Sequence, residues 1–320
     1  MASRVFVGVD IGGSSVKVGL VTDDGRVLGR QQTAIDPDDQ APERVVEHAH
    51  DLLEIILAET QTERTSLVAV GVASPGQLVD GGVIHAAANF PDWKDVPLRQ
   101  LFITRLGKEE VVMCNDADAA ILAEKWIGSA KGGIKNFIML TLGTGVGCGL
   151  VVDGQLVRGG SNFIEGGHMI VERNGRLCGC TQRGCLEAYS SATALVVEAQ
   201  EHLTAGADSI LSKYPIDEIN AKLIFEVAAK GDAMSIRLIE EAADYLGFAC
   251  VSLCRILDPE MIVLSGGMAE AGEMFIQLVR ASYLKYSWTK FPNPVIIEKA
   301  SAGYDSGILG AAAVACSFLV

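Results

Sequence analysis

One short stretch of the chain concentrates side chains that could bind a metal ion and a polar ligand. An eighteen-residue window contains one histidine and three cysteines, His168, Cys178, Cys180 and Cys185. A Cys₃His set is typical of closed, structural Zn²⁺ sites, whereas buried free cysteines are the ordinary alternative. The short spacing of the cysteines, with glycines between them, favours zinc. Because carboxylates flank the window, at Glu165 and Glu187, the loop could also clamp a ligand rich in hydroxyl groups.

Two glycine-rich turns, at residues 12–14 and 143–147, could present backbone N–H groups to phosphate. Each turn lies between two strand patterns, and an Asp-Gly turn and a further strand pattern follow. Asp10, at the first turn, could hold a hydrated metal ion, although a plain hairpin with a capping Asp fits this stretch equally well. Neither turn matches a Walker loop or a dinucleotide fingerprint. The repeated plan predicts two similar domains that face each other across a cleft.

An acidic segment follows the strand pattern at residues 110–114. Asp116 and Asp118 open the next helical pattern, where an Asp is most often an N-cap. The alternative is a catalytic base, because open α/β sheets bind ligands at the carboxyl ends of their strands. Position alone favours the cap.

The chain reads as mixed α/β. Strand patterns cover residues 4–10, 16–22, 26–34, 67–73, 110–114, 136–142, 148–152, 261–264 and 295–298. Helical patterns cover residues 42–60, 97–106, 119–127, 187–203, 224–230, 232–257 and 306–319. Residues 85–93 are expected to form an irregular loop, and a third glycine turn occupies residues 265–268.

Composition excludes several classes of protein. The chain has 320 residues, 49% of them hydrophobic, and a formal net charge of −14. That charge argues against a nucleic-acid surface, and the longest apolar runs are too short to span a membrane. Eight cysteines without a disulfide framework, and no secretory signal pattern, predict a reducing, cytoplasmic location.

Taken together, these motifs resemble those of a known family. The chain resembles sugar kinases of the ROK family (repressors, open reading frames, kinases), within the actin–hexokinase–Hsp70 superfamily. The resemblance rests on segments in the family's order, namely Asp10-Ile11-Gly12-Gly13-Ser14, Asn115-Asp116-Ala117, Leu142-Gly143-Thr144-Gly145-Val146-Gly147, Glu165-Gly166-Gly167-His168, Cys178-Gly179-Cys180, Gly184-Cys185-Leu186-Glu187 and Ser265-Gly266-Gly267. They span nearly the whole chain, and the spacing of the His-Cys cluster is the most specific of them.

The resemblance implies a two-domain, actin-like (ribonuclease H-like) α/β fold with a cleft between the domains. The smaller domain would cover residues 1–118, completed by the helix at 306–320. The larger would cover residues 119–305, with the zinc loop at 165–187.

The resemblance also implies site roles. Asp116 would be the general base that accepts the proton of the attacking sugar hydroxyl. The sugar would contact Asp116 and also Gly76, Asn89, Asn115, Glu165, His168 and Glu187. ATP–Mg²⁺ would lie against Asp10, Gly12, Gly13, Ser14, Lys17, Gly143, Thr144, Gly145, Gly266 and Gly267. Structural Zn²⁺ would be held by His168, Cys178, Cys180 and Cys185, so that His168 touches both sugar and metal.

The implied activity is an ATP-dependent hexose kinase, most simply a glucokinase. N-acetylmannosamine or N-acetylglucosamine kinase is the first alternative, and fructokinase is a weaker one. A sugar-responsive repressor would carry a DNA-binding segment before the first glycine turn, and only nine residues precede Asp10. Polyphosphate-dependent members are expected to lack the cysteine cluster. A homodimer or homotetramer is the family-level expectation.

Two positions depart from the family's pattern. Asp118 stands where an Asn is common, which adds negative charge near the expected base. Gly166 stands where many members carry a larger residue. The charge of Asp118 would raise the pKa of the base, unless Asp118 simply caps the helix, whereas Gly166 bears on selectivity for the sugar.

Overall fold

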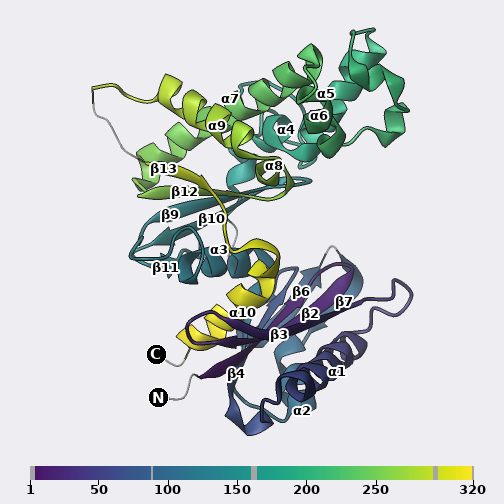
Figure 1. The fold of residues 1–320 in the computed structure, drawn as a ribbon, viewed down its shortest axis with the longest axis vertical. Coiled ribbons are helices and arrows are strands. Elements are labelled where there is room, and N and C mark those ends of the chain that lie inside the picture. Colours follow the sequence, from purple (N-terminus) through teal and green to yellow (C-terminus); the bar gives the residue numbers. More distant parts are fainter. Residues whose placement is uncertain (1–3, 88, 160–163, 291–294, 319–320) are drawn as a thin grey trace. The chain divides into compact units, whose positions relative to one another are not determined.

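The computed structural model describes residues 4–87, 89–159, 164–290 and 295–318 (Figure 1). The chain forms two compact units. The first unit is Met1–Lys131 with Ser301–Val320, and the second unit is Gly132–Ala300. The sequence predicts a domain boundary near Asp118. In the structure the division comes after Lys131, because the helix that begins at Asp116 packs within the first unit.

The first unit is built on a five-stranded sheet with the order β3-β2-β1-β4-β8. Its strands are β1 (Val5–Ile11), β2 (Ser15–Thr22), β3 (Val27–Ala34), β4 (Leu67–Ser74) and β8 (Val111–Asn115). A small sheet holds β5 (Leu78–Val79), β6 (Val83–Ala87) and β7 (Phe90–Val96). The helices are α1 (Pro42–Thr60), α2 (Leu98–Leu106), α3 (Asp116–Trp126) and α10 (Ser306–Ser317).

The second unit repeats this plan with the sheet order β11-β10-β9-β12-β13. Its strands are β9 (Phe137–Leu142), β10 (Val146–Val152), β11 (Gln155–Leu156), β12 (Met261–Ser265) and β13 (Ile296–Lys299). Its helices are α4 (Glu187–Ser190), α5 (Ala192–Thr204), α6 (Ala221–Ala228), α7 (Ala233–Leu257), α8 (Gly267–Glu270) and α9 (Glu273–Tyr286). In both sheets an antiparallel three-strand meander is followed by two parallel strands. The duplication read from the glycine turns is therefore confirmed.

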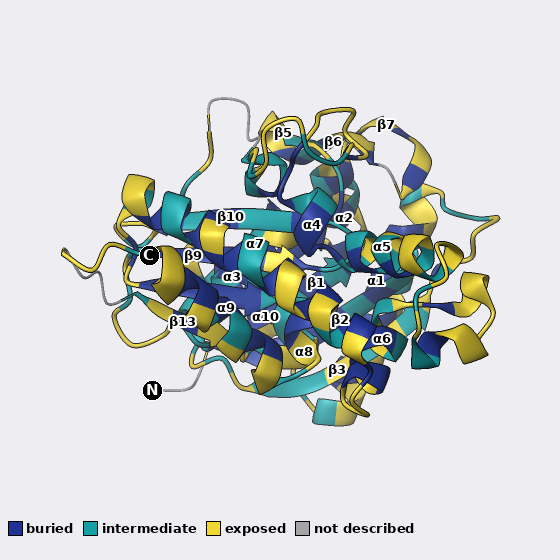
Figure 2. Cartoon of the chain, turned by 90° about the horizontal axis from the view of Figure 1, so that it is seen from above, coloured by how far each residue is buried: buried dark blue, intermediate teal, exposed yellow. Residues whose placement is uncertain are grey.

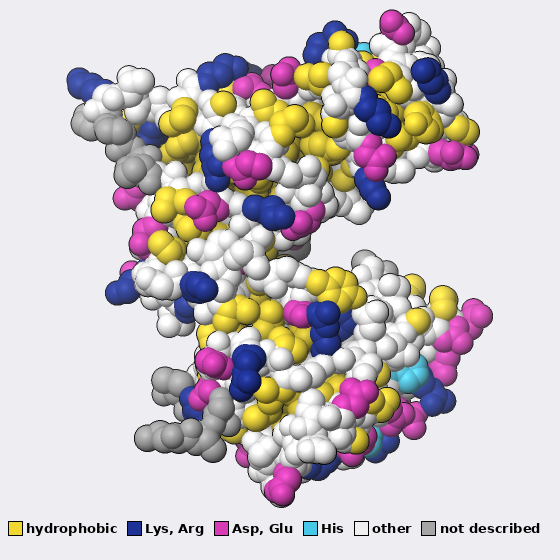
Figure 3. All heavy atoms as spheres, viewed as in Figure 1, with side chains coloured by type: hydrophobic (Ala, Val, Ile, Leu, Met, Phe, Trp, Pro, Cys, Tyr) yellow, Lys and Arg dark blue, Asp and Glu magenta, His cyan; other side chains and the backbone are white. Residues whose placement is uncertain are grey.

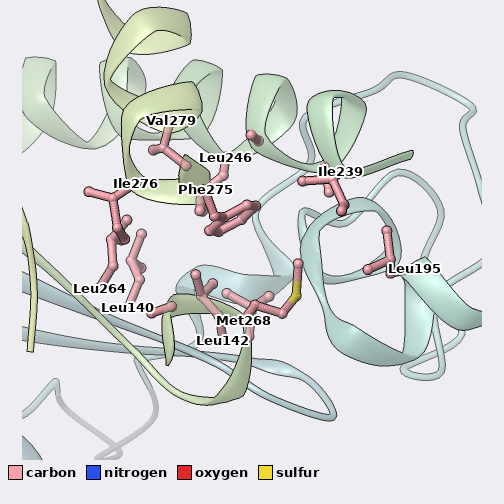
Figure 4. Close-up of a cluster of buried hydrophobic side chains, with 14 of the residues drawn as sticks. Leu140, Leu142, Leu195, Ile239, Leu246, Leu264, Met268, Phe275, Ile276 and Val279 are labelled. Atoms are coloured by element: carbon pink, nitrogen blue, oxygen red, sulfur yellow. The ribbon is translucent and has the colours of Figure 1, made fainter. Parts of the chain in front are cut away.

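Apolar residues build the interior of each unit. In the second unit, Leu140 and Leu264 of neighbouring strands pack with Phe275 and Ile276 of α9 (Figure 4). The face drawn in Figure 3 carries Lys and Arg side chains scattered among Asp and Glu side chains. Among the helices of the described residues, none has the length and apolar character needed to cross a membrane.

Helix α10 lies directly on the sheet of the first unit. Most residues of β1 and α10 are buried (Figure 2). Where the helix crosses the sheet, the strands carry glycine: a Cβ placed on Gly71 would lie 1.7 Å from the carbonyl oxygen of Ala311, and one on Gly8 would lie 2.0 Å from that of Ile308. Gly310 meets the Ala119 carbonyl of α3 just as closely. Backbone therefore packs on backbone at this contact, and α3 belongs with it.

We expect Gly71→Ala to destabilise the protein by about 3 kcal/mol or more, because the added methyl group has only helix backbone to displace. Gly147→Ala is the matched control, since its Cβ would meet nothing closer than 3.5 Å. The control is expected to change the free energy of unfolding by less than about 1 kcal/mol. Denaturant unfolding of both variants checks this, and equal midpoints would contradict the close packing.

Two sequence expectations about local structure are wrong. Residues 85–93 are largely strand, in β6 and β7, and not an irregular loop. The buried residues of β7 recur every third position and Asp95 has φ +51°, so the alternation that marks a strand is absent. The helix expected over residues 187–203 is broken at Ser191, which is extended and caps α5 by accepting a hydrogen bond from the Ala194 N–H (3.0 Å).

Candidate active site

The first unit gathers polar residues where parallel strands end. β1, β4 and β8 are parallel neighbours, with Asp10 opposite Ala73 and Ser74 opposite Asn115. Their carboxyl ends therefore lie along one edge of the sheet, where ligands of open α/β sheets bind. Gly76 follows β4 and has φ +98°, a conformation that favours glycine. Its carbonyl oxygen accepts a hydrogen bond from Asn115 Nδ2 (3.0 Å), which ties the two strand ends together.

Asn115, and not Asp116 or Asp118, is the N-cap of α3. Its Oδ1 accepts the Ala117 N–H at 2.9 Å, and its extended backbone is that of a cap. Asp116 is the first helical residue and is exposed, with Oδ1 also 2.9 Å from the Ala117 nitrogen. The local preference for a capping role is thus wrong for Asp116. Its carboxylate is exposed at the carboxyl edge of the sheet, where the resemblance predicts the general base.

Asp10 lies in the same unit, where both a positive and a negative side chain influence its carboxylate. Its carboxylate is 3.8 Å from Lys17 Nζ and lies close to Gly307 in the first turn of α10. Lys17 Nζ also lies 4.2 Å from the centre of the Tyr304 ring. Burial raises the pKa of Asp10 above its ordinary value, the Lys17 ammonium opposes this shift, and the Asp116 carboxylate adds to it. A cation placed beside Asp10 would relieve both unfavourable effects.

The first glycine turn is held by its own backbone. The Gly12 N–H donates to the Ser15 carbonyl (2.8 Å), and the Ile35 N–H donates to the Ser14 carbonyl (2.9 Å). The Gly12 amide is therefore committed to the turn, which makes Gly13 and Ser14 the better candidates for phosphate. The Asn89 side chain lies against Gly13, because a Cβ there would come within 2.8 Å of Asn89 Nδ2. The structure thus brings Asn89 to the glycine turn of its own unit.

In the second unit, three segments that carry predicted site residues converge on Val146. The Val146 N–H donates to Glu187 Oε2 (3.0 Å), and a Cβ on Gly167 would lie 1.9 Å from the Val146 carbonyl oxygen. Glu187 also covers Gly145, whose Cβ would meet Oε2 at 2.3 Å. The glycine turn at 143–145 is therefore packed directly against both ends of the loop from 165 to 187.

The third glycine turn completes this edge of the sheet. β9 and β12 are parallel neighbours, with Thr141 opposite Ser265. Gly266 has φ +88°, and a Cβ there would lie 2.5 Å from the Leu142 carbonyl oxygen. Gly267 opens α8, and no atom lies within 4 Å of a Cβ placed on it. The second unit thus brings two glycine turns together with open space beside one of them.

The four expected zinc ligands are brought together in an arrangement that is compatible with the metal. The ligand atoms of His168, Cys178, Cys180 and Cys185 all lie within 4.8 Å of one another. The Sγ atoms of Cys180 and Cys185 are 3.6 Å apart, and Cys178 Sγ is 3.6 Å from His168 Nδ1. Tetrahedral zinc with bonds of 2.3 Å to sulfur separates its ligands by about 3.5–3.8 Å. Zinc would therefore take Nδ1 of His168 and leave its other ring nitrogen for a second contact.

The loop also carries its own supports. Gln182 Nε2 donates to the His168 carbonyl (2.8 Å) and to Cys185 Sγ (3.2 Å). Cys178 Sγ lies 3.5 Å from Glu187 Oε1. Glu187 therefore contacts Cys178 of the Cys/His cluster with one oxygen and the glycine turn with the other. Glu165 precedes a turn of 3₁₀ helix (Gly166–His168) and is exposed.

The departure at Gly166 has a structural counterpart in Cys148. A Cβ on Gly166 would lie 2.6 Å from Cys148 Sγ and 2.7 Å from Cys148 Cβ. Burial raises the pKa of the Cys148 thiol to about 11, so it is neutral at pH 7. The Cys148 side chain thus occupies the space that a larger residue at 166 would need.

From the sugar-binding role that the resemblance implies for Glu165 and His168, we expect Gly166→Ala to raise the KM for the sugar by about tenfold. The added methyl group must push the loop that carries these residues off β10. Removing both clashing atoms with Cys148→Gly in the double variant is expected to restore most of the loss, which a double-mutant cycle measures as coupling. Cys148→Gly alone is the control. Additive losses in the double variant would contradict the assignment of this contact.

The contacts that join the glycine turn to the loop at residues 165–187 could not be predicted from the sequence. Val146 belongs to a glycine turn and Cys148 to a strand pattern, and neither is predicted from the sequence to contact a ligand. The available signal was the run of small residues at 166–167, since adjacent glycines mark close backbone approach.

Comparisons with known proteins identify the class. The ROK family model matches residues 6–317, and the chain belongs to the ROK family, as its motifs predicted. A glucokinase of Thermotoga maritima is 35% identical, with 98% of each chain covered. An N-acetylmannosamine kinase of Vibrio vulnificus is 32% identical over 95% of each chain.

A solved structure agrees with this assignment. The crystal structure of a ROK family glucokinase from Streptomyces griseus, in complex with glucose and AMPPNP, is 31% identical. It covers 96% of this chain and 98% of that chain with a TM-score of 0.75. The fold is accordingly the two-domain, actin-like ATPase fold of ROK kinases, which confirms the predicted fold class.

Proposed function

We propose that this protein is an ATP-dependent hexose kinase that converts glucose and ATP to glucose 6-phosphate and ADP. Full-length similarity to glucokinases supports the class of reaction. The similarity to an N-acetylmannosamine kinase is nearly as high, so identity alone does not select the sugar. Glucose is favoured because the solved relative binds glucose together with an ATP analogue.

The observation that carries the proposal is the convergence on Val146. One residue joins the glycine turn, Glu187 and the loop that carries His168, by its N–H and by close packing at its carbonyl group. A kinase needs its sugar acceptors held in a fixed position relative to the phosphates, because phosphoryl transfer depends mainly on alignment. This contact provides that rigidity within one unit.

In the proposed mechanism Asp116 accepts the proton of the attacking hydroxyl. Its exposed carboxylate is fixed by the helix that Asn115 caps. Asn115, Glu165, His168 and Glu187 would bind the other sugar hydroxyls, with Gly76 and Asn89 beside them. The glycine turns, with Lys17, would bind the phosphates, and Gly266 and Gly267 the adenosine.

Two metal ions complete the proposal. Mg²⁺, bound with ATP near Asp10, would neutralise phosphate charge. Zn²⁺, held by His168, Cys178, Cys180 and Cys185, would keep the His168 ring oriented towards the sugar. The free thiols and the use of ATP suit a cytoplasmic enzyme. The homodimer or homotetramer stays a prediction, which light scattering after gel filtration would test.

The test is an ADP-release assay with ATP–Mg²⁺ and five sugars: glucose, mannose, fructose, N-acetylglucosamine and N-acetylmannosamine. We expect kcat/KM for glucose to exceed the others by about tenfold or more. Preference for an N-acetyl sugar would change the substrate and keep the catalytic roles. Absence of turnover with all five would refute the kinase and favour a sugar-binding regulator.

A further inference from the structure

The chain passes between its two units twice, after Lys131 and again before Ser301. On the first-unit side, residues next to both crossings bind the same side chain, that of Glu124. Glu124 lies near the end of α3 and is 1% exposed. It has no role in the sugar or nucleotide sites described above.

The Glu124 carboxylate accepts hydrogen bonds from both crossings. Oε2 accepts the Ser129 N–H at 2.7 Å and the Ser301 N–H at 3.1 Å. Oε1 accepts the Ser301 N–H at 2.9 Å and the Ala302 N–H at 2.7 Å. The Ser129 and Ser301 hydroxyls also meet, at 3.0 Å. Segments that are 172 residues apart in sequence are thereby joined at one point.

The choice of residue is costly for the local structure. A carboxylate near the end of a helix opposes the helix dipole, and a buried carboxylate is strongly disfavoured unless hydrogen bonds satisfy it. Gly128 leaves space for it, since a Cβ there would lie 2.2 Å from Glu124 Oε2. A helix end that needed only packing would be more stable with an apolar residue. The carboxylate is therefore explained by its four hydrogen bonds to three backbone N–H groups.

We infer that Glu124 is a positioning residue that fastens the two crossings to each other, so that they move as one hinge. The inference rests on the proposed kinase function, because two-domain kinases close over their substrates and exclude water. Such closure is absorbed by a few residues at the ends of elements. Because both connecting segments bind one carboxylate, their backbone conformations change together. Domain closure then follows one path.

Glu260 of the second unit provides a matched control. Its Oε1 accepts the Lys135 N–H at 2.8 Å and the Asn136 N–H at 2.9 Å. The chemistry is the same, a carboxylate bound to backbone amides, but all of its partners lie within the second unit. Glu260→Gln therefore changes the same kind of contact on the second-unit side of the first crossing only, and leaves the contacts that join the two crossings in place.

The experiment compares the wild-type protein, Glu124→Gln and Glu260→Gln by hydrogen–deuterium exchange and by steady-state kinetics. The probes are glucose and ATP–Mg²⁺. In Glu124→Gln one acceptor oxygen is replaced by an NH₂ group that faces N–H donors. We expect amide exchange at residues 129 and 301–302 to become about tenfold faster. We expect kcat to fall about tenfold, with each KM changed by less than about threefold.

A readout beyond stability is the ratio of ADP released to sugar phosphate formed. It should stay near one in the wild type and in Glu260→Gln and rise in Glu124→Gln, because loosely directed closure admits water. Unchanged exchange at the crossings would overturn the inference. Faster exchange with unchanged kcat and ratio would reduce Glu124 to a structural residue and also overturn it.

A second variant covers the case in which Glu124→Gln does not fold. Ala302→Pro removes one N–H donor at a position whose φ, −65°, already suits proline. It should show the same changes more weakly, and a wild-type ratio with a wild-type kcat would overturn the inference. If the wild-type protein phosphorylates no sugar, the proposed function fails, whereas the exchange pattern still decides whether Glu124 joins the crossings.

Discussion

Replacing Asp116 with Asn is expected to lower kcat by about 10²–10⁴-fold, the usual contribution of a positioned general base. The amide has nearly the same shape as the carboxylate and cannot accept the proton. The Ala117 N–H that lies 2.9 Å from Asp116 Oδ1 is also within reach of the Asn115 cap, so α3 should keep its first turn. The effect should therefore be confined to the chemical step. Single-turnover kinetics with glucose and ATP–Mg²⁺ measures it.

The control is Asp118→Asn, which removes a carboxylate from the same helical turn. It is expected to change kcat by less than about fivefold, since Asp118 is not proposed to touch the sugar hydroxyl. Glucose affinity, measured by calorimetry, should stay within about threefold in both variants. An Asp116→Asn enzyme with near-normal kcat would exclude Asp116 as the base, and loss in Asp118→Asn alone would move the role to that residue.

The duplicated architecture could be predicted from the sequence because its signals are local. A glycine turn between two strand patterns, with an Asp-Gly turn after them, dictates an antiparallel meander wherever it occurs. Both copies formed such a meander, at the β1–β3 and β9–β11 strands. The helical pattern at residues 232–257 begins with Asp232, and in the structure Asp232 caps α7, where its Oδ2 accepts the Ser235 N–H at 2.9 Å.

Long-range packing could not be predicted. The sequence around Gly71 does not predict its close contact with the Ala311 carbonyl, which lies on a helix from the other end of the chain. The same holds for Glu124, whose amide partners at 301 and 302 are remote in sequence. Sequence motifs predict which side chains take part in the chemistry. The contacts that hold those side chains in place depend on long-range packing of the backbone, which the motifs do not predict.

The N-cap of α3 shows where a local sequence rule fails. Each of Asn115, Asp116 and Asp118 is a good N-cap residue, and propensity cannot rank them at a strand end. The structure assigns the cap to Asn115, which also binds the Gly76 carbonyl. With the cap already supplied, the carboxylate of Asp116 is left for another role, as the proposed mechanism requires.

Replacing Cys180 with Ser is expected to remove the zinc and then the sugar affinity. Structural zinc sites of this kind bind with about 10–16 kcal/mol, and most of that energy stabilises the fold around the metal. Cys180 is the exposed member of the cluster, so its replacement leaves no core cavity and tests coordination itself. We expect zinc content below the wild-type stoichiometry, a lower melting temperature, and a loss of kcat/KM of about 10–100-fold.

Sugar affinity is lost after zinc because of the contacts within the loop at residues 165–187. Once the metal is absent, His168 loses the partner that fixes its ring, and Cys178 no longer holds its position beside Glu187 Oε1. Two proposed sugar contacts therefore weaken together, so the KM for glucose should rise more than the KM for ATP. Cys316→Ser, a cysteine of the first unit outside the cluster, is the control and should retain zinc and activity. A metal-free Cys180→Ser enzyme with full activity would show that the ligand geometry is not used for catalysis.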